Sequence, residues 1–156
     1  STFCRIGARR MLEILELLCE GRGRAEDLAN LEELADRVSR TSLCGLGQTA
    51  PNPVLTSLRY FREEFEAHVR DRRCPAGRCA ALVDYRINAS CIGCTLCAQA
   101  CPVVAIAYRP HERHAVDLAA CTRCNMCFEA CQDGAVEVVS GGAVCAVSPR
   151  AAERTA

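Results

Sequence analysis

Eight cysteines in two runs of identical spacing are the residues best suited to chemistry in this sequence. One run extends from Cys91 to Cys101 and the other from Cys121 to Cys131, each with the spacing C-x-x-C-x-x-C-x-x-x-C. Together they supply eight thiolates, the number that two cubane [4Fe–4S] clusters require. We therefore predict two clusters as the cofactors of this part of the chain.

Two other chemistries use grouped cysteines. A disulfide framework needs paired Cβ atoms about 3.8 Å apart, whereas cysteines separated by two residues around a tight turn converge on one point. Structural zinc is the stronger alternative, because four thiolates also close a tetrahedral zinc site.

The composition sets limits on the rest of the chain. With four Phe, three Tyr and no Trp in 156 residues, the core must be aliphatic, with metal centres stabilising whatever cannot collapse alone. The 19 basic and 19 acidic residues balance, which favours neither nucleic acid nor an anionic membrane as a partner. No apolar run reaches membrane-spanning length, and no signal segment is present. Because cluster-forming thiolates need a reducing compartment, we expect a cytoplasmic protein.

The N-terminal part, residues 1–73, has the pattern of a small helical bundle. Apolar stripes predict helices over residues 5–20, 25–39 and 53–70, with a glycine-rich loop at 41–47. Asn52 is the expected N-cap of the third helix, with Pro53 at its first position. The three stripes are Met11, Ile14, Leu15 and Leu18; Leu28, Leu31, Leu34, Ala35 and Val38; and Val54, Leu58, Phe61, Phe65 and Val69.

A linker over residues 74–82 leads to a domain over 83–147, with a flexible tail at 148–156. Each half of this domain has an extended piece, a cysteine-rich turn, a brief helix and an apolar strand, the strands at 103–108 and 135–139. The expected fold class is α+β: a helical bundle followed by a pseudo-symmetric two-cluster domain. The connecting loop carries His111 and His114, which we expect to be solvated.

The C-terminal pattern resembles two-cluster ferredoxins, in which the fourth cysteine of each motif ligates the other cluster. Pro102 matches the pattern after the first motif, whereas Gln132 replaces the second proline. The resemblance implies one cluster held by Cys91, Cys94, Cys97 and Cys131, and a second held by Cys121, Cys124, Cys127 and Cys101.

The N-terminal part carries a second resemblance, in Cys4-Arg-Ile-Gly and in the stretch Thr41-Ser-Leu-Cys44-Gly-Leu-Gly-Gln-Thr-Ala-Pro-Asn-Pro53. These segments resemble the C-terminal part of the flavin- and NADH-binding subunit of respiratory complex I. They are closer to the homologous subunits of soluble NADH-linked and electron-bifurcating hydrogenases and formate dehydrogenases, which carry a ferredoxin-like extension. The resemblance covers nearly all of residues 1–140 and implies that FMN and NADH bind in an upstream part or in a partner subunit.

The same family holds a further cubane cluster, to which Cys4 and Cys44 correspond as two of four ligands. Ser1 falls on another ligand position, so this third site is incomplete and indicates a truncated or split subunit. Either the missing ligands come from an upstream segment or another chain, or Cys4 and Cys44 are bare thiols.

His68, Cys74 and Cys79 form a third group with metal-ligand chemistry, since zinc accepts imidazole nitrogen and thiolate sulfur. The family resemblance implies a structural zinc here, with one ligand from elsewhere. The alternative is a histidine on a helix surface and two unconnected cysteines. Cys19 and Cys145 are expected to be inert thiols.

No nucleotide-binding fingerprint or catalytic constellation is visible, so this chain itself shows no substrate site. We expect an electron-transfer module of an NADH-dependent multisubunit oxidoreductase, of hydrogenase or formate dehydrogenase type. It would relay electrons between a flavin/NADH site outside the chain and a low-potential acceptor. The alternatives are a free-standing ferredoxin-type carrier, which the N-terminal bundle disfavours, and a zinc-stapled interaction module.

Overall fold

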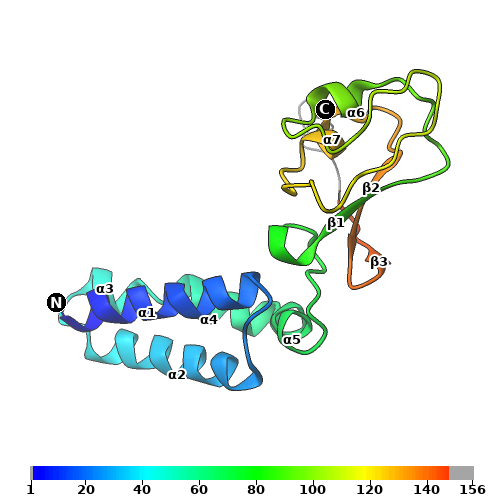
Figure 1. Ribbon diagram of the computed structural model, residues 1–156. Helices are drawn as coiled ribbons and strands as arrows, with labels where there is room; N and C mark the ends of the chain where they lie inside the picture. The colour runs from blue at the N-terminus through cyan, green and yellow to red at the C-terminus, as the bar shows by residue number, and fades with distance from the viewer. Residues whose placement is uncertain (1, 148–156) are drawn as a thin grey trace. The chain divides into compact units, whose positions relative to one another are not determined.

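The computed structural model describes residues 2–147, and the chain divides after Cys74 into two compact units (Figure 1). Each unit has its own secondary structure, helical in the first and mixed in the second. The predicted flexible tail, residues 148–156, lies outside the described residues, as does Ser1.

The N-terminal unit contains five helices within its described residues, and α1 and α2 lie side by side (Figure 1). The first two helices confirm the predictions made for 5–20 and 25–39 to within a few residues. Gly21 ends the first of them with φ +70°, while its amide donates to the Leu18 carbonyl at 3.1 Å. The helices are α1 Thr2–Cys19, α2 Ala25–Thr41, α3 Gly45–Thr49, α4 Asn52–Tyr60 and α5 Arg62–Arg70.

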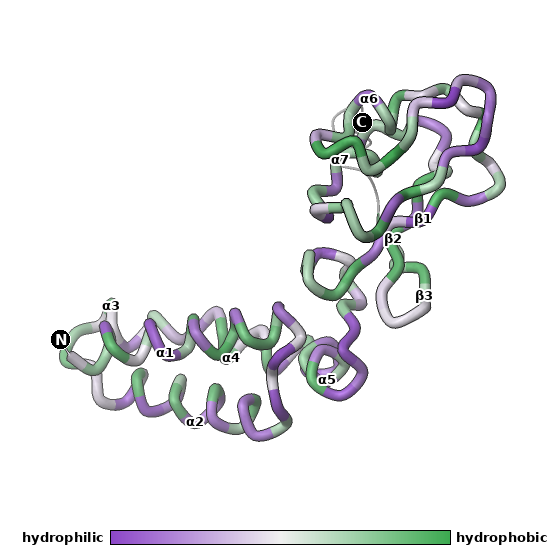
Figure 2. The backbone as a smooth tube through the Cα atoms, viewed as in Figure 1, coloured by the Kyte–Doolittle hydropathy of each residue, from purple (hydrophilic) through white to green (hydrophobic). Residues whose placement is uncertain are grey.

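The predicted stripes of the first two helices form an aliphatic core. Figure 2 shows the alternation of apolar and polar residues along α1 and α2 that is typical of amphipathic helices. Leu31 and Ala35 have no exposed surface, and Met11, Leu18, Leu28 and Leu58 pack with them. Burial of this kind stabilises the unit by roughly 1.5–3 kcal/mol for each large side chain.

The predicted third helix is interrupted. Phe61 adopts φ −125° and ψ 30°, which separates α4 from α5 and leaves its own ring 56% exposed. The prediction of one continuous stripe through Phe61 was wrong because the bend lets Leu58 and Phe65 pack without it. The predicted N-cap was one residue late, since Asn52 is already the first residue of α4 and the buried Pro51 precedes it as the cap.

The expected loop at 41–47 is likewise partly helical. Cys44 is in extended backbone, and the chain turns into the short helix α3 at the next residue. The Thr49 hydroxyl donates to the Gly45 carbonyl at 2.9 Å, and the Gln48 side-chain amide donates to the Ser42 carbonyl at 3.1 Å. These bonds fold the segment back onto the end of α2.

The C-terminal unit combines short helices with a small antiparallel sheet of order β1-β2-β3, which confirms the α+β class. The predicted strand at 135–139 is present, but the one at 103–108 is reduced to a single bridge between Ile106 and Val116. Val104 has φ +54°, which breaks the extended run. The elements are η1 Ala80–Leu82, β1 Asp84–Ile87, α6 Leu96–Ala100, α7 Met126–Ala130, β2 Val136–Ser140 and β3 Ala143–Val144.

The sheet presents one apolar face to the interior of this unit. Tyr85 and Ile87 of β1 pair with Val138 and Val136 of β2, and none of the four is more than 4% exposed. On the opposite face Arg86 and Glu137 form an ion pair at 2.8 Å. The cysteine-rich turns pack against the buried face. Within residues 2–147 no helix has the length and apolarity needed to cross a membrane.

Leu31→Ala tests the aliphatic core of the N-terminal unit. Because Leu31 has no exposed surface, we expect the free energy of unfolding of this unit to fall by about 2–5 kcal/mol. Urea titration followed by helical circular dichroism measures it. Leu43→Ala, at a side chain 85% exposed, is the matched control and should change stability by less than about 0.5 kcal/mol.

Candidate iron–sulfur centres

Two small cavities in the C-terminal unit are each lined by four cysteines. One, called the first quartet, brings Cys131 to the three closely spaced cysteines of the first motif, with Ile87 and Val136 of the sheet beneath. The other, called the second quartet, brings Cys101 to the three cysteines of the second motif. Each fourth cysteine thus lines the cavity of the opposite motif. The quartets are Cys91, Cys94, Cys97 and Cys131, and Cys121, Cys124, Cys127 and Cys101.

The backbone around each motif makes the turns that this convergence requires. The residue after the second cysteine is left-handed in both, with φ +66° at Thr95 and φ +69° at Asn125. The residue before that cysteine also has positive φ, +72° at Gly93 and +58° at Arg123. Successive turns of this kind wrap the chain around a point and aim peptide N–H groups toward it.

Peptide N–H groups reach the sulfur atoms of the fourth cysteines. The Ala105 amide donates to Cys101 Sγ at 3.2 Å, and the Ala135 amide donates to Cys131 Sγ at 3.3 Å. Such bonds stabilise a thiolate over a thiol and orient it as a ligand. A third bond of this type runs from the Arg123 amide to Cys121 Sγ at 3.4 Å.

Burial and crowding oppose ionisation of the innermost thiols. Burial, with Cys121 adding to it, raises the pKa of Cys127 to about 12. Burial, followed by the neighbouring Cys91, also raises the pKa of Cys97. These thiols therefore remain protonated near neutral pH unless a cation shares the site, and a bound metal is what converts such groups to thiolates.

One histidine of the connecting loop is placed differently from its prediction. His114 is only 4% exposed rather than solvated, and it lines the cavity of the first quartet. Its Nδ1 lies 3.7 Å from Cys91 Sγ. The prediction was wrong because a long-range contact holds the loop against the sheet: Arg113 Nη2 donates to the Ile87 carbonyl at 2.6 Å. His111 is exposed, as predicted.

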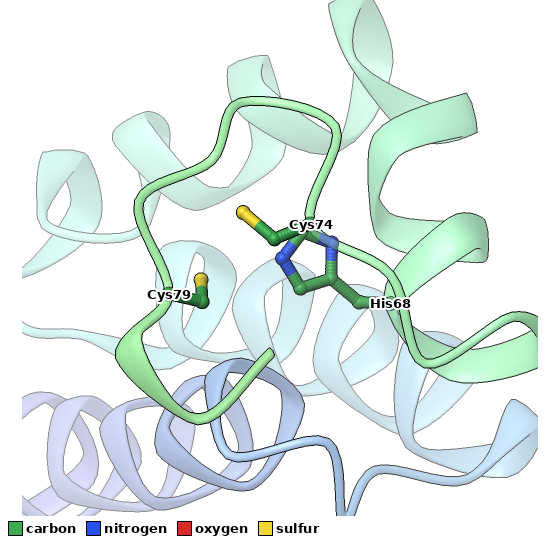
Figure 3. A group of neighbouring side chains, drawn as sticks. All are labelled: His68, Cys74 and Cys79. Carbon is green, nitrogen blue, oxygen red and sulfur yellow. The ribbon is translucent and has the colours of Figure 1, made fainter. Parts of the chain in front are cut away.

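The third predicted group also comes together. The ligand atoms of His68, Cys74 and Cys79 all lie within 4.8 Å of one another (Figure 3). Figure 3 shows the three side chains pointing toward a common centre. His68 Nδ1 is 2.7 Å from the Glu64 carbonyl, a contact that orients the imidazole ring. Two sulfurs and one nitrogen suit zinc.

The two cysteines predicted to belong to an incomplete third cluster lie in separate segments of the N-terminal unit. Cys4 is in the first turn of α1, and Cys44 is exposed immediately before α3. Gly47 of α3 lies against Cys4, since a Cβ at Gly47 would be 3.0 Å from Cys4 Cβ. None of the fourteen cysteines forms a disulfide in the structure.

Two family models match this chain, one in each of its two parts. Residues 2–68 match the NADH-ubiquinone oxidoreductase-F iron-sulfur binding region. Residues 90–136 match the 4Fe-4S dicluster domain. Both resemblances noted in the sequence are therefore confirmed.

Individual relatives agree with these assignments. The HndC subunit of the NADP-reducing hydrogenase from Solidesulfovibrio fructosivorans is 46% identical over 72% of this chain and 23% of its own length. The F-type subunit of the NADH-quinone oxidoreductase from Streptomyces coelicolor is 40% identical over 47% of this chain and 16% of its own length. The chain thus spans less than a quarter of either relative.

The donor sets fit the cofactors that these families name. Each quartet offers four sulfur ligands in one cavity, with peptide N–H donors on the sulfurs. The chain is therefore an iron–sulfur electron-transfer protein of the 4Fe-4S class. More particularly, it corresponds to the iron–sulfur part of the F-type subunits of NADH-linked oxidoreductases.

Gly93→Ala tests the turn at the first quartet. A Cβ at Gly93 would lie 2.6 Å from the Glu112 amide nitrogen and 2.7 Å from His111 backbone, with φ already +72°. We expect loss of the iron of this quartet, measured as iron and sulfide per chain after anaerobic purification. Gly134→Ala is the control, because it has a similar φ of +64° but nothing within 4 Å. The control should keep its iron at a cost of about 1–2 kcal/mol.

Proposed function

We propose that this chain relays single electrons between a flavin/NADH site outside residues 2–147 and a low-potential acceptor, within a multisubunit oxidoreductase. One observation carries the proposal: two four-cysteine cavities and an F-type iron–sulfur region occur in the same chain. Bound clusters would supply one-electron redox chemistry. The protein's own residues set ligand spacing, burial and hydrogen bonds.

Exposure at the edge of each quartet supports exchange of electrons with a partner. The second cysteine of each motif, Cys94 or Cys124, is exposed, while the third, Cys97 or Cys127, is buried. A cluster held in this way would have one edge near the surface, where a redox partner could approach. The relatives are named as subunits, which supports other subunits as those partners. The need to keep so many thiols reduced favours the cytoplasm as the compartment.

We further propose that the quartets are the ligand sets, crossed between two pseudo-symmetric halves. Several paired features support this symmetry. The four cysteines of each motif share one order of exposure: intermediate, exposed, buried, intermediate. The two fourth cysteines each accept from the amide four residues later. A side-chain hydrogen bond also joins the same two positions in each half: Gln99 donates to Thr95, and Asn125 donates to Glu129.

Cys131→Ser and Cys101→Ser form a matched pair that tests the crossing. Cys131→Ser should impair the cluster of the first quartet, and Cys101→Ser that of the second. In each case iron should fall from about eight to about four atoms per chain. Electron paramagnetic resonance of the reduced proteins distinguishes the two losses. If Cys131→Ser removed the signal that Cys121→Ser also removes, the crossing would be wrong.

Cys4 and Cys44 are proposed as ligands of a further cluster, completed by donors from outside the described residues. The match of residues 2–68 to an iron-sulfur binding region supports this. So does the packing of Gly47 against Cys4, which brings the α3 turn to the start of α1. Anaerobic iron and sulfide analysis with and without an upstream segment tests it, with about four more iron atoms expected when the site is complete.

His68, Cys74 and Cys79 are proposed as zinc ligands with a structural role. Cys145 is a candidate for the fourth position, because it lies beside the turn: a Cβ at Gly77 would be 3.0 Å from Cys145 Cβ. A structural zinc stabilises the fold without taking part in redox chemistry, since Zn²⁺ has no accessible second oxidation state.

Cys79→Ser tests the zinc proposal separately from the clusters. We expect zinc to fall from about one atom per chain to well below half, because one of the thiolate ligands is lost. Iron and sulfide should be unchanged. Elemental analysis by mass spectrometry measures both metals in one sample. Cys19→Ser, at an exposed cysteine ending α1, is the control and should keep both metals.

A further inference from the structure

We propose that His114 is a positioning residue for the cluster of the first quartet, donating a hydrogen bond from Nδ1 to the Cys91 sulfur and raising that cluster's reduction potential. The inference rests on the proposed function, since it assumes that the first quartet holds a cluster. The contact is the 3.7 Å separation of His114 Nδ1 and Cys91 Sγ. It lies within the longer range that hydrogen bonds to sulfur allow.

The loop that carries His114 is fastened on both sides of the ring. Arg113 donates from Nη2 to the Ile87 carbonyl of β1 at 2.6 Å. The His111 amide donates to the Gly93 carbonyl at 3.1 Å, inside the first motif. Beyond the ring, Val116 pairs with Ile106. These contacts fix the backbone of the loop on both sides of His114, and the fixed backbone holds the imidazole next to Cys91.

The surroundings of the second ring nitrogen, Nε2, indicate that His114 donates the hydrogen bond to Cys91. His114 Nε2 is buried and has no hydrogen-bond partner within residues 2–147. A proton on Nε2 would leave a buried donor unsatisfied and turn the lone pair of Nδ1 toward an anionic sulfur. A proton on Nδ1 instead gives the thiolate a donor and leaves only a bare acceptor unpaired. The second arrangement has the lower free energy.

A donor to a ligand sulfur acts on the redox equilibrium. The N–H group withdraws electron density from the sulfur and stabilises the reduced state, which carries one more negative charge. The effect is strengthened by burial, because water does not screen it there. Removing the donor therefore makes the cluster harder to reduce.

Within residues 2–147, the second quartet has no histidine that could donate to one of its sulfurs. Among the residues that line its cavity in the described chain, none is a histidine. Tyr85 is the polar ring there, and its hydroxyl donates to Asn125 Oδ1 at 3.0 Å rather than to a cysteine. The proposed effect is thus specific to one of the two clusters, which gives the experiment an internal reference.

The test compares His114→Leu with His114→Asn in the intact chain. Leu removes the donor, whereas the Asn side-chain amide can place an N–H near the position of Nδ1. Potentiometric titration with electron paramagnetic resonance gives both potentials. We expect His114→Leu to shift the oxidised-to-reduced ratio of the first cluster on the order of tenfold toward oxidised, about 59 mV for one electron. His114→Asn should restore most of the shift, and the second cluster should not move.

Two further measurements keep the outcome decisive. His111→Asn changes the exposed histidine of the same loop and should leave both potentials unchanged. Pulsed electron paramagnetic resonance of wild-type protein should detect a weak histidine-nitrogen coupling to the first cluster, even if His114→Leu fails to load iron.

Equal shifts in His114→Leu and His114→Asn, an unchanged potential in His114→Leu, or no nitrogen coupling would each overturn the inference. Absence of two clusters from the wild-type chain would instead overturn the proposed function.

Discussion

Gathering four cysteine sulfurs around one small cavity, with the innermost of them buried, is the constraint on which the C-terminal unit depends. Burial and mutual repulsion both oppose the charge of a thiolate there, as the raised pKa of Cys127 shows. The helices α6 and α7 are too short to hold the turns by propensity alone. Metal–thiolate bonds can offset both the cost of the buried charge and the low stability of the short helices. Metal binding and folding are therefore coupled in such units. The sheet supplies an apolar face against which the turns pack, and bound clusters would supply further stability.

The N-terminal unit follows another strategy. Its core consists of aliphatic side chains from α1, α2 and α4, with Leu31 fully buried and no metal required among them. Cys4 and Cys44 stand at the beginning of α1 and α3, outside that core. A redox centre at this edge would be carried by a scaffold that folds without it. We therefore expect the N-terminal unit to fold without a metal and the C-terminal unit to depend on one, an arrangement that suits a fixed relay better than a diffusing carrier.

Local periodicity predicted the parts of this structure that depend on neighbouring residues. The stripes of the first two helices and the two cysteine motifs were readable because their spacing is regular. The bend at Phe61 was not, since helix propensity alone does not oppose continuing through it; packing of Leu58 and Phe65 decides it. The burial of His114 was also hidden, because its loop is held by the bond from Arg113 to Ile87, 26 residues earlier. Long-range contacts of this kind leave little trace in a single sequence.

The two cysteine motifs share one spacing, so any difference between the two centres must arise from residues outside the ligands. Gly93 of the first motif corresponds to Arg123 of the second, which would place a cation beside only one cluster. Yet Arg123 Nη2 is paired with Asp84 at 2.9 Å, and its Nε donates to the Val83 carbonyl at 2.9 Å. Much of that positive charge is thereby neutralised before it can act on the second quartet. A buried neutral donor at short range is screened far less than a paired, partly exposed charge. We therefore expect the orientation of nearby N–H groups to distinguish the two centres more than the formal charges of the motifs do.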